Sequence, residues 1–260
     1  MSQNPTSTCV PARIPRYSQT YPSTVPPTDI PDTSEQPDHL LDAVLLATAG
    51  GLIDAIVYLN HGHVFANAMT GNVIFLGIAF TTRNWSYVVP HFIPLVGFVA
   101  GVLTSKHLRS LRNRFLLLGL GLEIVTIFAL GWLPASFPEI LFTGTIAYVA
   151  AIQVASFRRV DRFAYNSTFV TGNLRDVAEG LYDALTPNSD PEIREKGLSQ
   201  ARHLGLICLF FLAGAIFGAW AAPRFGNHSL WLAEPALLAV AFHLLRNQLS
   251  LTSTKPAQSR

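Results

Sequence analysis

The sequence predicts an all-α, polytopic integral membrane protein with six to seven transmembrane helices in two internal repeats. Of its 260 residues 50% are hydrophobic and 13% are charged, which shifts the composition from the soluble average toward that of membrane proteins. Long apolar runs alternate with short basic loops, and the triplet Thr-Gly-Asn stands once in each half of the chain. The runs indicate membrane spans, the basic loops indicate orientation, and the triplets indicate the repeat.

The first 38 residues differ in composition from the rest. They hold 8 of the 17 prolines, and Ser, Thr and Pro together make up half of them. With no apolar periodicity to drive folding, residues 1–38 are predicted to form a disordered arm. The arm lacks a basic start followed by an apolar stretch, so we expect the first span to direct the chain to the membrane.

The apolar runs are long enough to cross a bilayer as helices, since about 20 helical residues cover roughly 30 Å of hydrocarbon. Two weaker runs contain acidic residues but are still counted as spans. A transmembrane domain is therefore predicted at residues 39–248, followed by a tail at 249–260. The predicted spans are residues 40–60, 87–105, 115–134, 140–157, 204–222 and 228–245.

Residues 67–82 leave the number of spans open. The apolar stretch after Thr70, about 13 residues, is short for a crossing. A re-entrant segment gives six spans, two inverted repeats and both termini inside. A crossing segment gives seven spans and moves the N-terminus outside. The sequence slightly favours the re-entrant segment.

Basic residues between the runs predict orientation through the positive-inside rule. Two loops carry them, at residues 106–114 and 158–162, and further ones follow the last run. Both loops and the C-terminus are therefore predicted to be cytoplasmic.

The two triplets indicate a tandem repeat. They are 101 residues apart, at 70–72 and 171–173. A pair of glycines spaced four residues apart follows each triplet: Gly97 and Gly101 in the first half, Gly214 and Gly218 in the second. The polar insert at 185–200 accounts for the longer spacing in the second half. We expect repeat 1 at about 40–134 and repeat 2 at about 138–246, and either glycine face is a candidate for a homo-oligomer contact.

Four stretches, "GLIDAIVYL", "VFANAMTGNVIFLG", "AIQVASFRR" and "STFVTGN", follow one another in an order that resembles the YoaK family, or domain of unknown function 1275. The resemblance covers roughly residues 40–246. It implies a multi-pass membrane protein without a known activity, because the biochemistry of that family is unassigned. Asp161, Arg162 and Asn166 depart from it, since relatives more often carry small or apolar residues there.

The triplets are the candidate functional site. Non-helical backbone is tolerated in a membrane only where protein or a wet cavity satisfies it, so Gly between Thr and Asn indicates a break in the chain. Two helix N-termini facing each other would form a polar site with positive dipole ends. The alternative is that the Thr or Asn caps a helix and the Gly makes a packing contact. The predicted substrate-binding residues are Asp54, Asn67, Thr70, Gly71, Asn72, Gln153, Thr168, Thr171, Gly172 and Asn173.

Ionisable residues within the runs are proton-coupling candidates. Asp54 is the first choice for a proton or cation site, followed by Glu123 and Glu234, because a carboxylate at bilayer depth requires a cavity or a partner. A carboxylate bonded to a neighbouring helix is the other interpretation. His61 and His63 flank Gly62 but have no further metal-ligating side chain nearby, so no metal site is predicted.

These features together predict the transport of a small solute across the bilayer. The alternative is a non-transporting membrane scaffold or sensor. No catalytic motif is present, so an enzyme is not expected, and neither is a cofactor. The net charge of +2, spread in short clusters, gives no reason to expect nucleic acid.

Overall fold

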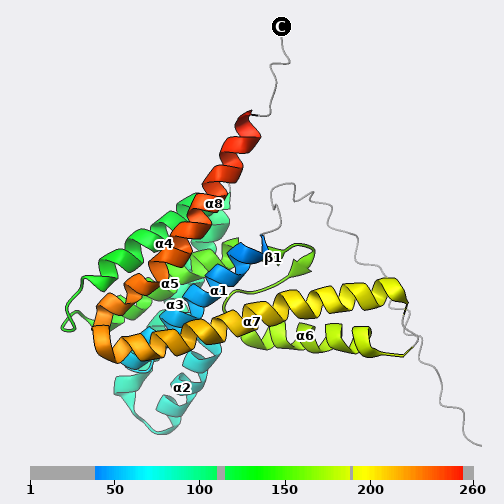
Figure 1. Ribbon diagram of the computed structural model, residues 1–260. Coiled ribbons are helices and arrows are strands. Elements are labelled where there is room, and N and C mark those ends of the chain that lie inside the picture. The colour runs from blue at the N-terminus through cyan, green and yellow to red at the C-terminus, as the bar shows by residue number, and fades with distance from the viewer. Residues whose placement is uncertain (1–38, 110–114, 188–189, 254–260) are drawn as a thin grey trace, which may run out of the picture. The chain divides into compact units, whose positions relative to one another are not determined.

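The computed structural model describes residues 39–109, 115–187 and 190–253, and in these the chain is helical apart from loops and one short hairpin (Figure 1). The predicted disordered arm at 1–38 lies outside the described residues. Strands β1 (Arg159–Val160) and β2 (Phe163–Ala164) pair antiparallel. The helices are α1 (Leu40–Asn60), α2 (Met69–Thr81), α3 (Trp85–Leu108), α4 (Phe115–Gly131), α5 (Glu139–Ser156), α6 (Val170–Leu185), α7 (Pro191–Phe225), the 3-10 helix η2 (Gly226–Ala233) and α8 (Glu234–Ser253).

Four helical stretches in the described part of the chain are long and apolar enough to cross a membrane: α1, α3, α5 and residues 191–249, which join α7, η2 and α8. The apolar helices α2 and α4 are shorter, with 13 and 17 residues. The prediction of an all-α polytopic membrane protein is confirmed.

Three helix boundaries in the second half differ clearly from the prediction. Helix α7 begins at Pro191, well before the apolar run at residue 204, because Pro is accommodated in the first turn and Asp190 caps the Glu192 amide. The last helix begins at Glu234 and not at residue 228, because Gly226, with φ 55°, ends α7 and a 3-10 turn follows. Helix α8 continues to Ser253, beyond the predicted end of the transmembrane domain at 248.

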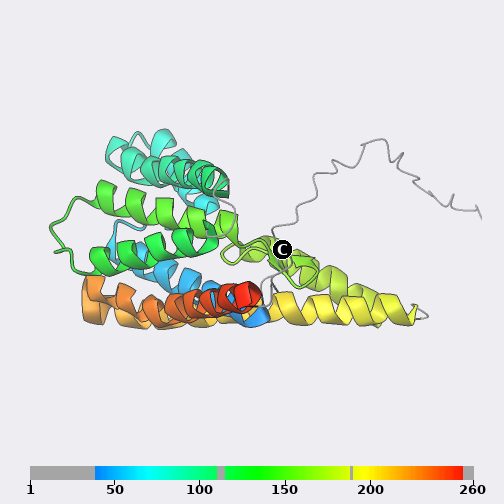
Figure 2. The same cartoon turned by 90° about the horizontal axis from the view of Figure 1, so that it is seen from above.

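Helix α7 packs along α1, and α3 packs along α5 (Figures 1 and 2). Glycines let the backbones approach at both contacts. Gly214 and Gly218 face Thr48 and Leu52 of α1, while Gly97 and Gly101 face Gly144 and Tyr148 of α5. Both glycine faces thus make contacts within one chain, to α1 and α5, and a homo-oligomer contact stays a prediction.

A hydrogen-bonded junction joins three segments around His61, at the end of α1. Its Nδ1 lies 2.7 Å from Glu139 Oε2, and its Nε2 lies 3.0 Å from Asn227 Oδ1. The Asn227 Nδ2 donates to the Leu133 carbonyl at 2.9 Å, which leaves the amide oxygen for His61. The two ring nitrogens of His61 thus face two oxygen atoms, one from a carboxylate and one from an amide.

We expect His61→Asn to lower the free energy of unfolding by about 1–3 kcal/mol, since it leaves the buried Asn227 amide oxygen without its donor. His63 is exposed and has a φ of 59°, a conformation that Asn tolerates, so His63→Asn is the matched control. Thermal unfolding in detergent compares the two. Equal losses in both variants would contradict a structural role for the junction.

Candidate functional site

Asn72 fastens the extended segment that separates α1 from α2. Its Oδ1 accepts from the Phe65 amide at 3.0 Å, and its Nδ2 donates to the Phe65 carbonyl at 2.8 Å. Asn72 is fully buried, so both bonds are shielded from water. The side chain thus pairs with the backbone as a neighbouring strand would. We call this pair of bonds the Asn72 clasp.

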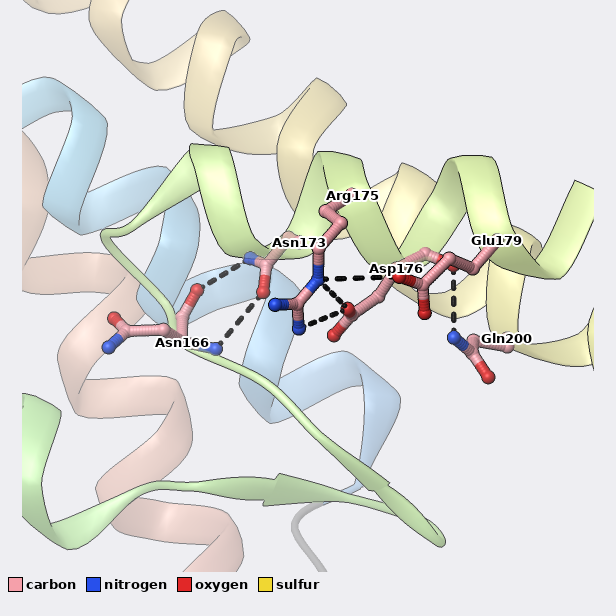
Figure 3. A network of polar contacts seen from close by, with 6 residues as sticks. All are labelled: Asn166, Asn173, Arg175, Asp176, Glu179 and Gln200. Carbon is pink, nitrogen blue, oxygen red and sulfur yellow. Dashed lines mark hydrogen bonds and ion pairs between the residues drawn. The ribbon is translucent and has the colours of Figure 1, made fainter. Parts of the chain in front are cut away.

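Asn173 forms an equivalent clasp in front of α6 (Figure 3). Its Oδ1 accepts from the Asn166 amide at 3.2 Å, and its Nδ2 donates to the Asn166 carbonyl at 2.7 Å. In both clasps the asparagine reaches back seven residues. The two triplets therefore share a geometry as well as a sequence.

The other members of the triplets lie outside the clasps. Thr70 and Thr171 are exposed. A Cβ on Gly71 would lie 2.6 Å from the Phe65 ring, whereas a Cβ on Gly172 would meet nothing within 4 Å. Helices α2 and α6 begin one residue before each triplet and have no side-chain cap. The interpretation of Thr or Asn as a helix cap is therefore wrong, and the tight glycine contact exists only at Gly71.

Asp54 lies in α1 opposite the first extended segment. Its side chain is nearly buried, with 5% of the residue exposed, and Oδ1 accepts from the Asn67 amide at 2.7 Å. Its Oδ2 and the Asn67 Oδ1 are buried and have no hydrogen-bond partner within the described part of the chain. Asp54 thus joins α1 to a break in the helical chain and keeps one oxygen free.

The second extended segment reaches the same helix. A Cβ on Gly50, one turn before Asp54, would lie 2.7 Å from Thr168 Cγ2. The Asn166 Oδ1 accepts from the Thr168 and Phe169 amides at 3.1 and 3.2 Å, so this segment is fixed by its own side chain. The structure thus places Asn67 and Thr168 beside α1, the helix that carries Asp54.

Among the described residues, four buried polar atoms of the predicted site and its neighbours lack a hydrogen-bond partner: Asp54 Oδ2, Asn67 Oδ1, Gln153 Nε2 and Ser167 Oγ. Most buried polar groups in proteins are hydrogen-bonded, so such a group is typical of functional regions. Ser167 and Asn166 are absent from the sequence-predicted site. The 101-residue offset was a signal for Asn166, since it places Asn166 opposite Phe65. Ser167 had no signal beyond its position beside Thr168.

Glu123 and Glu234 lie on α4 and α8, which pack against each other. They are 1% and 8% exposed. Neither forms a hydrogen bond to Asp54 within the described residues. The three proton-coupling candidates therefore do not form a single cluster.

Charged residues of α6 form a surface network beside α7 (Figure 3). Arg175 Nη2 lies 2.7 Å from Asp176 Oδ1, and its Nε lies 3.6 Å from Glu179 Oε1. The hydrogen bond to Asp176 raises the pKa of Arg175. Gln200 of α7 donates to the Asp176 carbonyl at 2.9 Å, which ties the two helices together. This polar face is unlike the apolar α2 at the matching place in the first half.

The fold and the polar region define a polytopic helical membrane protein in which two Asn-clasped segments interrupt the helices. Residues 43–243 match the sequence profile of the family described as "Protein of unknown function (DUF1275)", and the chain belongs to this family. This confirms the family membership predicted from the four sequence stretches.

One curated relative is the UPF0700 transmembrane protein YoaK of Bacillus subtilis (strain 168). It is 28% identical over 196 residues, which cover 72% of this chain and 86% of the relative. No solved structure matches the chain.

Proposed function

We propose that this membrane protein carries a small polar solute through a site centred on Asp54. The observation that carries the proposal is the buried Asp54 carboxylate, with one oxygen on the Asn67 amide and the other without a protein partner. Ionisable residues within membrane spans are expensive and mark ion or substrate pathways. Interrupted helices at repeat interfaces form the binding sites of many carriers.

The structure modifies the site that the sequence predicted. The amides of Asn72 and Asn173 are engaged in clasps, and Thr70 and Thr171 are exposed. We therefore propose that the triplets position the site without lining it. The proposed solute-binding groups are those with free buried atoms or a place beside Asp54: Asp54, Asn67, Gln153, Ser167 and Thr168.

We infer that the chain consists of two repeats, α1–α4 and α5–α8. The two clasps occupy equivalent positions, and the helix contacts are reciprocal. The first helix of each half packs against the third helix of the other, as α1 does with α7 and α5 with α3. Reciprocal contacts of this kind are expected when a two-fold axis relates two repeats.

Contacts between helix ends support six spans, with α2 and α6 not crossing. His61 follows α1 and contacts Glu139, which begins α5, so both lie on one side of the membrane. The helices between them, α2 to α4, must then cross an even number of times. With α3 and α4 both counted as spans, α2 does not cross. The same reasoning for Glu139 and Asn227, through their shared His61, supports an α6 that does not cross.

Contacts on the opposite side of the membrane are consistent with six spans. Arg109 after α3 donates to the Ala155 carbonyl near the end of α5, at 2.6 Å. His243 of α8 lies 2.9 Å from Asp42 at the start of α1. With six spans all four residues share one side, which the basic loops assign to the cytoplasm. The two repeats are then inverted, and the C-terminus is cytoplasmic.

We expect Asp54→Asn to reduce solute flux by roughly tenfold or more, equivalent to about 1.4 kcal/mol, while folding is retained. The amide oxygen of Asn can still accept from Asn67, but the charge is lost. Flux is followed with a pH dye sealed in proteoliposomes while amino acids, sugars, organic acids and amines are added in turn. Asp176→Asn, on the surface of α6, is the control. Equal flux in both variants would remove Asp54 from the site.

A solute-independent test separates a carrier from a scaffold. In a chain with both native cysteines, Cys9 and Cys208, replaced by serine, single cysteines are placed at Asn67 and Thr168. A carrier must wet these positions in one of its states, so small aqueous thiol reagents should label them. Leu52→Cys, 2% exposed in the core, is the protected control. Labelling no faster than at this control would favour the scaffold.

One surface favours the scaffold as the second candidate. Helix α6 exposes apolar side chains on its outer face, with Leu174 52%, Leu181 41% and Leu185 75% exposed. The spacing of these leucines follows one side of a helix. A scaffold would contact its partner through this stripe, because the glycine faces are covered within the chain.

A further inference from the structure

Two glutamates that are 111 residues apart in the sequence face a common place between α4 and α8. Glu123 lies in the middle of α4 with 1% of its surface exposed, and Glu234 begins α8 with 8% exposed. Glu234 lines one hollow together with Ile124 and Val125, the residues that directly follow Glu123 in α4. Each residue is solitary in the sequence, and only the fold makes them a pair.

Neither carboxyl group is neutralised by a basic side chain. Glu123 Oε2 and Glu234 Oε1 are buried, and neither has a hydrogen-bond partner among residues 39–109, 115–187 and 190–253. Within the part of the chain that the structure describes, no Lys or Arg forms an ion pair with either one. A carboxylate in hydrocarbon without a partner is costly, and a second one beside it adds repulsion.

The charged groups on the neighbouring elements are engaged elsewhere. On α1, Asp42 is bonded to His243 of α8, and Asp54 to the Asn67 amide. The other groups lie towards helix ends or on the surface. Glu139 of α5 is bonded to His61, Arg109 to the Ala155 carbonyl and His91 of α3 to the Tyr87 carbonyl. His228 of η2 packs against Trp231, and Lys106 of α3 and Arg246 of α8 are exposed. A proton is therefore the simplest cation that can neutralise the pair.

An apolar hollow of about 400 Å³ borders Glu234 between α4 and α8. It is lined by Ile124, Val125 and Phe128 of α4 together with Trp231, Glu234 and Leu238. The Trp231 indole donates to the Phe128 carbonyl at 3.1 Å and holds one wall in place. The hollow offers an apolar reagent a route to Glu234 that a charged reagent does not have.

We propose that Glu123 and Glu234 form a proton-binding pair, which takes up and releases a proton as one coupled unit between α4 and α8. One added proton removes the repulsion between the two carboxylates and turns one of them into a neutral acid with an O–H donor. The pair uses no residue of the Asp54 region. The proton-binding pair can therefore be tested independently of the solute site.

Carbodiimide labelling of the full chain in detergent tests the proposal. The acid O–H adds across a C=N bond of dicyclohexylcarbodiimide, and an oxygen-to-nitrogen acyl shift leaves a stable N-acylurea, so only a protonated carboxyl reacts. At neutral pH, peptide mass mapping is expected to place the adduct on Glu123 or Glu234. A water-soluble carbodiimide with an added amine should instead modify Glu179, whose side chain is 64% exposed. Absence of label from the pair between pH 5 and 9, with Glu179 modified normally, would overturn the proposal.

The coupling is tested with Glu123→Gln and Glu234→Gln, which preserve side-chain shape. In the parent chain the last proton leaves against the charge of the neighbour, so labelling should persist to higher pH than in either variant. We expect a difference of about one pH unit, which marks coupled sites. Identical pH curves for the parent and both variants would show two independent acids. Unchanged thermal unfolding confirms that the variants are folded, and a double variant should lose the adduct.

Discussion

Gly214→Leu is expected to abolish the folded state of this protein. A Cβ at this position would overlap the carbonyl oxygen of Thr48 in α1. The obstacle is backbone, so it cannot rotate away, and α7 would have to separate from the helix along which it packs. Overpacking alone costs about 1–3 kcal/mol, and loss of this contact adds to that cost, while domains have only about 5–15 kcal/mol of stability.

Gly121→Leu in α4 is the matched control, since a Cβ there would meet nothing within 4 Å. In a helix Leu is favoured over Gly, so we expect this variant to be as stable as the parent or up to about 1 kcal/mol more stable. Size-exclusion profiles and thermal unfolding in detergent compare the two. If both variants remain monodisperse with similar unfolding temperatures, the close approach of α1 and α7 is wrong.

Asn72→Ala is expected to lower the free energy of unfolding by about 2–5 kcal/mol, because both polar groups of Phe65 lose their buried partner. Asn173→Ala should lower it by a similar amount, since its clasp has the same two bonds. Asn72→Asp tests the two hydrogen bonds of the clasp separately. A carboxylate can accept from the Phe65 amide but cannot donate to the carbonyl, so only part of the stability should return.

The neighbouring threonines are the controls for the clasps. Thr70 and Thr171 are exposed, so Thr70→Ala and Thr171→Ala should change stability by no more than about 0.5 kcal/mol. Thermal unfolding in one detergent measures all the variants together. A loss at Thr70 as large as that at Asn72 would mean that the triplet acts through something other than the clasp.

The long apolar runs predicted helices well because bilayer thickness dictates span length. The runs at 40–60, 87–105 and 140–157 became α1, α3 and α5, shifted by no more than three residues at either end. Helix ends that are set by polar residues were harder to predict from the sequence. The start of α7 at Pro191 depends on an Asp190 cap within a charged stretch, where hydropathy contains no helix signal.

The candidate site was predicted only in part, since the sequence marks polar residues but not their partners. The repeated triplet singled out Asn72 and Asn173 as important. Their bonds run seven residues back to main-chain groups, which no side-chain pattern encodes. Glu123 and Glu234 come together solely through the packing of α4 on α8.

Helix α7 is continuous, so a small rotation of the helix would move its N-terminal end over a long distance. Its 35 residues extend about 52 Å, and Pro191 lies roughly 33 Å from the middle of the apolar part near residue 213. Its internal proline, Pro223, lies close to the C-terminal end, so no proline interrupts the helix between Pro191 and residue 213. A rocking of about 10° around residue 213 would move Pro191 by roughly 6 Å. Small rotations against α1 would thus be amplified into a displacement that a soluble partner can sense.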